Sequence, residues 1–89
     1  MDKDKYVVID DTNIVAFLNL RGFNFTPFIK DGALEKKRVG FKIQGDIDDA
    51  LMDYYSNKEV PIQDYITCLK KVRGAMFMLK GINEDEHKI

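Results

Sequence analysis

The fold is decided by one stretch, residues 38–44, which reads Arg-Val-Gly-Phe-Lys-Ile-Gln and is the clearest alternation of apolar and polar residues in the chain. Successive side chains of a strand point to opposite faces, so Val39, Phe41 and Ile43 share one face. The polar positions, Arg38 and Lys42 among them, share the other. The stretch therefore predicts a strand with one buried and one exposed face.

A second strand precedes it. Residues 23–26 alternate between aromatic and polar side chains, and Asp31-Gly32 is a turn signal. Residues 23–44 therefore predict a β-hairpin with its aromatic residues facing inward. Pro27 cannot donate a backbone hydrogen bond to a neighbouring strand, so this strand is expected at a sheet edge or with a bulge at Pro27.

The chain before the hairpin predicts a strand and a helix. Residues 6–9 are a β-branched apolar run, and residues 10–13 are good helix N-caps. A helix is expected over 12–21, closed by Gly22. Because the hairpin strands pair with each other, the first strand must lie at an edge of a three-stranded sheet. Both of its faces are apolar, which leaves two alternatives open, a partner that covers it or partial exposure.

Two helices are expected after the hairpin. Three aspartates, at positions 46, 48 and 49, favour the start of the first, which extends to about residue 56. The last helix is predicted over 61–81, from Pro61 to Gly81. Its core-facing residues repeat at intervals of three and four and are Ile62, Tyr65, Leu69, Val72, Met76 and Leu79. The remaining residues, 82–89, are expected to form a frayed polar tail.

These elements predict a single domain over residues 1–81. Its order is β-α-β-β-α-α, and its class is α+β. The expected architecture has two layers, a three-stranded sheet with the helices packed on one face.

Composition limits the function. The 89 residues include 14 basic and 15 acidic residues, so the net charge of −1 gives no global attraction to nucleic acid or to an anionic membrane. One cysteine excludes an internal disulfide framework. No apolar run reaches the ~20 residues of a membrane span, and the N-terminus does not resemble a signal peptide, so a cytoplasmic protein is expected.

Catalytic and metal-binding residues are scarce. The single histidine, His87, lies in the predicted tail, and the single cysteine, Cys68, lies on the apolar side of the last helix. Nucleophilic catalysis with a histidine base and a zinc site both require clusters that the chain lacks. We therefore expect no enzyme activity, no metal and no cofactor.

The first candidate surface is an interface for protein–protein contact. The outer side of the last helix is expected to carry Lys70, Lys71, Gly74, Phe77 and Met78. Aromatic and methionine side chains beside basic residues are typical of interfaces. Tyr6 and Val8 of the first strand are a further interface candidate. The alternative, that Phe77 packs on the tail or on the first helix, remains open.

The second candidate surface would bind nucleic acid. Lys36, Arg38 and Lys42 are expected on the outer face of the hairpin, together with Lys30 and Phe28. Basic residues beside an exposed aromatic ring on a sheet occur in proteins that bind single-stranded nucleic acid. The alternative is a hydrated sheet face whose lysines discourage edge pairing.

Several short motifs carry a resemblance that covers residues 5–80. They are Phe17-Leu18 with Gly22-Phe23, Val39 with Phe41 and Ile43, Asp53-Tyr54-Tyr55, and Leu69-Lys70. In this order they resemble a family of small uncharacterised proteins, a domain of unknown function from Gram-positive bacteria and their phages. The resemblance implies a phage or mobile-element origin and transfers no catalytic or ligand-binding residue.

The main expectation is therefore a non-enzymatic binding module of phage or mobile-element type in the bacterial cytoplasm. It would act by protein–protein contact, as a homodimer or by modulating a host protein whose identity the sequence does not give. The alternative is a small nucleic-acid-binding regulatory protein that uses the basic hairpin face.

Overall fold

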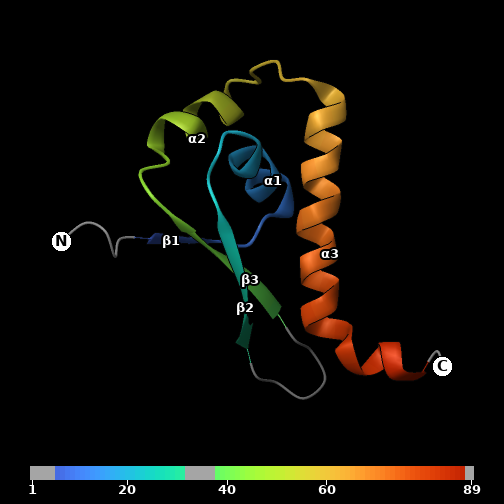
Figure 1. Cartoon of the computed structure of the whole chain (residues 1–89). Coiled ribbons are helices and arrows are strands. Elements are labelled where there is room, and N and C mark those ends of the chain that lie inside the picture. The colour runs from blue at the N-terminus through green and yellow to red at the C-terminus, as the bar shows by residue number, and fades with distance from the viewer. Residues whose placement is uncertain (1–5, 32–37, 88–89) are drawn as a thin grey trace.

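A computed structural model describes residues 6–31 and 38–87. Its elements are β1 (Tyr6–Ile9), α1 (Thr12–Leu20), β2 (Phe25–Asp31), β3 (Arg38–Gln44), α2 (Asp48–Tyr55) and α3 (Ile62–His87) (Figure 1). The predicted element order and the α+β class are confirmed. Within these described ranges, no helix is long and apolar enough to cross a membrane.

The sheet is antiparallel and has the order β1-β3-β2. The alternating stretch 38–44 therefore forms the central strand. Ile43 lies opposite Val7 on one side and Phe25 on the other. The prediction that β1 lies at an edge is confirmed, and β2, which contains Pro27, is the other edge. The register irregularity of β2 lies between Ile29 and Asp31 rather than at Pro27.

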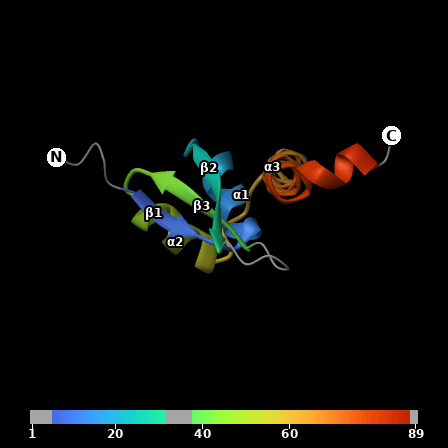
Figure 2. The ribbon, with the colours of Figure 1, turned by 90° about the horizontal axis from the view of Figure 1, so that it is seen from below.

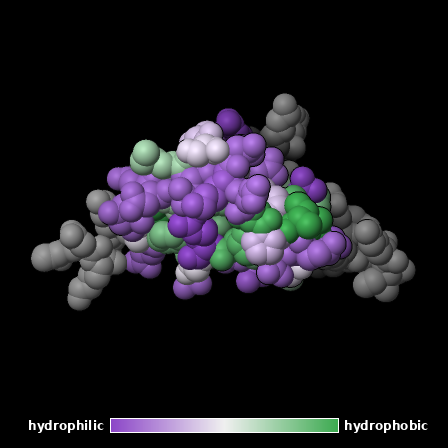
Figure 3. Space-filling model, turned by 90° about the horizontal axis from the view of Figure 1, so that it is seen from above, coloured by the Kyte–Doolittle hydropathy of each residue, from purple (hydrophilic) through white to green (hydrophobic). Residues whose placement is uncertain are grey.

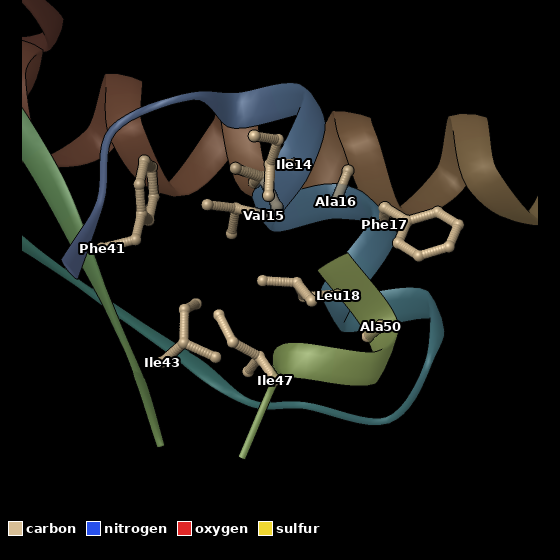
Figure 4. Close-up of a cluster of buried hydrophobic side chains, with 10 residues drawn as sticks. Ile14, Val15, Ala16, Phe17, Leu18, Phe41, Ile43, Ile47 and Ala50 are labelled. Carbon is tan, nitrogen blue, oxygen red and sulfur yellow. The ribbon is translucent and has the colours of Figure 1, made fainter. Parts of the chain in front are cut away.

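The core lies between the inner face of the sheet and α1. Phe41 and Ile43 are fully buried there, and all five residues from Ile14 to Leu18 are buried (Figure 4). Ile47 and Ala50 complete the cluster near α2, and Val72 completes it from α3. Burying a large apolar side chain contributes about 1.5–3 kcal/mol, so this cluster is the main source of stability.

Local sequence sets both ends of α1. The Asp11 carboxylate accepts a 2.8 Å hydrogen bond from the Asn13 backbone N–H, which caps the helix start. Gly22 follows the helix with φ +101°, a conformation that favours glycine. The Phe23 N–H then donates to the Leu18 carbonyl over 3.0 Å. The predicted capping and closure of this helix are confirmed.

The predicted ends of the other helices need correction. α2 begins at Asp48, and Asp46 precedes it, where its carboxylate accepts a 3.2 Å hydrogen bond from the Asp48 N–H. α3 does not end at Gly81 but continues to His87, so residues 82–87 are helical. A glycine inside a helix costs about 1 kcal/mol, which weakens the helix without ending it. In Figure 2 the early part of α3 is seen along its axis and its last turns bend away.

The length of α3 explains a second correction. α3 has 26 residues and α1 has 9, so their lengths are about 39 and 14 Å. α3 contacts α1, β2 and β3, and these elements cannot cover its whole length. Ile62, which was expected in the core, is 60% exposed because it lies at the overhanging start of α3.

Candidate functional site

The first candidate surface is the outer face of α3, defined by Lys70, Lys71, Gly74, Phe77 and Met78. All five are exposed, and Phe77 and Met78 are 61% and 65% exposed. Val72, on the opposite side of the same helix, is completely buried. Phe77 is therefore largely exposed and does not belong to the buried core cluster.

Gly74 lies between the basic and the apolar residues of this face. A Cβ atom built at Gly74 would meet nothing within 4 Å. Glycine is unfavourable inside a helix by about 1 kcal/mol relative to alanine. Packing among the described residues therefore does not explain the glycine at this position.

Exposed apolar residues continue along α3 toward its start. Ile62 and Ile66 are both exposed, and with Phe77 they fall within about 60° of rotation around the helix axis. Figure 3 views the molecule from the end where α2 and the start of α3 lie, and its strongest hydrophobic colour is on the α3 side. Sequence reasoning missed Ile62 because its spacing also fits the buried side of the helix.

Polar contacts hold the helices against one another. The Tyr65 hydroxyl of α3 donates a 3.0 Å hydrogen bond to the Asn13 carbonyl of α1. Burial is the main cause that raises the pKa of Tyr65 above its usual value, and Tyr54 and Asp11 add to it. Burial likewise raises the pKa of Tyr54, whose ring packs edge-on against Phe17 at 5.6 Å between centroids. The Tyr65 hydrogen bond thus joins α3 to α1, and the Tyr54 ring packs α2 against α1.

A salt bridge joins α2 to the end of α1. The Arg21 guanidinium lies 2.7 Å from the Asp53 carboxylate and 5.6 Å from the centre of the Phe17 ring. Because both charged side chains are partly exposed, this pair contributes at most about 1 kcal/mol. Its role here is to position α2 at the side of the core.

The second candidate surface is the outer sheet face, which we define by Tyr6, Thr26, Phe28, Lys42 and Gln44. Lys42 occupies the central strand, and its Nζ lies 5.1 Å from the centre of the Tyr6 ring and 5.4 Å from that of Phe28. The register explains this arrangement, because Lys42 is opposite Val8 and Thr26 and diagonal to both rings. The structure thus places Phe28 beside Lys42, as the sequence analysis expected.

Gly40 permits side chains to cross this face. A Cβ atom at Gly40 would lie 2.8 Å from Cδ of Lys30 and 3.2 Å from Cε1 of Phe28. Lys30 crosses Gly40 and reaches the Asp10 carboxylate, with contacts of 2.8 and 3.0 Å. Lys30 is therefore neutralised by its own ion pair.

A hollow of about 390 Å³ opens on this face and is lined by Tyr6, Asn24, Thr26, Lys42 and Gln44. The described residues of its lining supply a cation, a phenol, a hydroxyl and two amides, and none of them carries a carboxylate, a thiol or an imidazole. The sequence analysis did not foresee this hollow, because Asn24 and Gln44 gave no signal of their own.

The other predicted residues fall as follows. Tyr6 and Val8 are exposed on the outer side of β1, which is the same side as Lys42. Arg38 is exposed at the start of β3 and lies opposite Asp31 in the register. Lys36 lies outside the described residues. Cys68 is half-buried.

Metal ligands do not gather in the described part of the chain. No group of three or more His, Cys, Asp or Glu side chains there could hold a metal ion. At the end of β1, Asp10 forms an ion pair with Lys30, and Asp11 caps the start of α1.

Comparison with known protein families gives a match. Residues 4–78 match a domain of unknown function, DUF5659. The chain belongs to this family. The DUF5659 match includes both candidate surfaces, from Tyr6 to Met78, and it confirms the expectation of a small domain family of unknown function. Comparison with curated proteins and with solved structures gives no match.

Proposed function

We propose that the protein is a non-enzymatic binding module that acts by protein–protein contact and forms a homodimer through the outer face of α3. The observation that supports this proposal is the exposure of Phe77 and Met78, at 61% and 65%, on a helix whose other side is buried. Water contact with two large apolar side chains is unfavourable, and burying them in an interface would recover about 1.5–3 kcal/mol for each.

The face is self-complementary, which favours a second copy of the chain as the partner. It has projecting side chains at Phe77 and Met78 and a bare position at Gly74, three and four residues away. In an antiparallel pair of α3 helices centred near residue 76, Gly74 of each copy would face these projecting side chains of the other copy. A two-fold interface of this kind uses the same patch on both subunits.

The charges of the face are compatible with this antiparallel arrangement. Lys70 and Lys71 lie five to six residues from the proposed centre, so the lysines of the two copies would be about 17 Å apart along the helix axis. The Debye length is about 8 Å at physiological ionic strength, so repulsion between the lysines would be screened. A parallel pair would instead place like charges side by side.

Sedimentation equilibrium over 5–500 μM protein tests the proposal. We expect the mass to rise with concentration toward twice the 10.3 kDa of one chain. Phe77→Asp and Met78→Asp should give the mass of one chain throughout. Met52→Asp is the matched control, because Met52 is 67% exposed on α2, away from the α3 face.

Circular dichroism of each variant shows whether the fold is retained. A native mass of one chain at every concentration would refute the proposal. So would a dimer that is unaffected by Phe77→Asp. The phage or mobile-element origin, the action on a host protein and the cytoplasmic location stay predictions from the sequence.

A further inference from the structure

We infer that the outer sheet face binds single-stranded nucleic acid, with a base against Tyr6 and a phosphate at the Lys42 ammonium. This site is separate from the α3 face and does not depend on the homodimer. Three properties of the described residues carry the inference, namely an exposed aromatic ring at Tyr6, a lysine without a described carboxylate partner and a hollow of suitable size.

The first property is an outer sheet face on which the Tyr6 ring is exposed. The helices contribute to the core on the inner face, where Phe41 and Ile43 are buried, and Tyr6 on the outer face is 49% exposed. Tyr6 lies on β1 and Phe28 on β2, one on each side of the central strand. With about 4.8 Å between neighbouring strands, the two rings stand on positions about 10 Å apart across the sheet. Aromatic rings on an open sheet are stacking platforms for unpaired bases.

The second property is the charge of Lys42. Its Nζ lies near two rings, at 5.1 and 5.4 Å from their centres, and it forms no salt bridge with another described residue. Lys30, a further lysine on this face, already pairs with Asp10. No carboxylate occurs among the described residues that line the hollow beside Lys42. Lys42 therefore supplies a positive charge that an anionic ligand can neutralise.

The third property is the hollow itself. Its volume of about 390 Å³ lies within the range of pockets that hold small ligands. Tyr6 provides one wall, and the side chains of Asn24 and Thr26 bring a hydroxyl and an amide to the same space. An aromatic wall, a cation and short polar groups fit one nucleotide of a flexible strand. A rigid duplex would keep its bases stacked and could not present one to Tyr6.

Fluorescence anisotropy with labelled 12-mers of dT and of U tests this inference, at 20 and 200 mM NaCl. We expect saturable binding at 20 mM salt, weakened about fivefold at 200 mM salt for each phosphate contact. A labelled 12-base-pair duplex should bind at least tenfold more weakly than the single strands.

Two variants locate the site. Lys42→Gln should weaken binding about tenfold and reduce its salt dependence, and Tyr6→Ala should weaken it roughly five- to a hundredfold through lost stacking. Lys58→Gln, which removes an exposed lysine beyond α2, is the control and should change the dissociation constant less than twofold. Tyr6→Phe should retain binding, which separates stacking from a general loss of structure.

Three results would overturn the inference. The first is no anisotropy change with 100 μM protein at 20 mM salt. The second is equal affinity for duplex and single strand, which would exclude base stacking at Tyr6. The third is binding that Lys58→Gln weakens as much as Lys42→Gln does, which would indicate attraction to charge without a defined site.

Discussion

The helices α1 and α3 use apolar residues in opposite ways. α1 carries five consecutive buried residues, Ile14 to Leu18, and lies among the sheet, α2 and α3. α3 buries Val72 completely on one side and leaves Phe77 and Met78 exposed on the other. Both helices have apolar residues on more than one side, yet only α1 is covered on all of them.

This difference separates apolar residues that stabilise the fold from those available for binding. A helix that is apolar all round is normally buried. The apolar residues of α1 are explained by the core of the chain itself. Those on the outer face of α3 stay largely exposed, and the proposed dimer gives them a partner.

The largest expected effect comes from removing a buried side chain of α1. Leu18 is completely buried, and Leu18→Ala should lower the free energy of unfolding by about 2–5 kcal/mol. Phe77→Ala on α3 should change it by less than about 0.5 kcal/mol in dilute monomer. Urea titration monitored by circular dichroism measures both. Equal losses for the two variants would show that Phe77 belongs to the core.

A smaller loss is expected where the two helices meet. Tyr65→Phe removes the 3.0 Å hydrogen bond from α3 to the Asn13 carbonyl of α1, which should cost about 0.5–1.5 kcal/mol. Tyr55→Phe is the control, because the Tyr55 side chain is 72% exposed. An unchanged urea midpoint for Tyr65→Phe would show that this bond does not hold α3 in place.

Gly74→Ala should change folding and association in opposite directions. Beyond the adjacent helix backbone and the two neighbouring residues, the added Cβ would meet nothing within 4 Å, so the variant should stabilise the monomer by up to about 1 kcal/mol through better helix propensity. The same methyl group should obstruct the close approach of a second α3 and raise the dimer dissociation constant severalfold. Thermal unfolding and sedimentation of the variant measure the two effects. Stabilisation without weaker association would argue against close helix contact at Gly74.

The smallest effect concerns pH. Burial raises the pKa of both Tyr65 and Tyr54 above the ordinary value of 10.0, so the folded state keeps these protons at a pH where the unfolded chain loses them. Their contribution is present below about pH 10 and is lost as the pH rises through the folded-state values. Tyr54→Phe and Tyr65→Phe should each reduce the decline in urea midpoint between pH 9 and 11. If the urea midpoint declines as much in both variants as in the unsubstituted protein, the two tyrosines are not the cause of the decline.

The sequence was sufficient for most of the fold because alternation and capping are local. The pattern of 38–44 set the central strand, and Asp11 and Gly22 set the ends of α1. Local rules failed at Ile62 and Gly81, whose environments depend on how far α3 extends beyond α1. Spacing alone cannot supply that length.

The exposed face of α3 could be predicted from the sequence, whereas the hollow on the sheet could not. Phe77 and Met78 were assigned to the outside because they fall off the buried stripe of α3, and both are exposed. The hollow on the sheet depends on the alignment of Tyr6, Asn24 and Lys42 from three separate segments. Strand register determines that alignment, and no residue pattern in the sequence predicts the register of β1 against β3.

In the proposed dimer, Phe77 and Met78 contact a second copy of the chain. Isotope-filtered NOE spectroscopy on a mixture of ¹³C-labelled and unlabelled protein measures this contact directly. We expect intermolecular NOEs between the Met78 methyl group and the Phe77 ring, with none to the Met52 methyl group. Their absence at a concentration where the mass is that of a dimer would mean that another surface pairs, and the role assigned to α3 would be wrong.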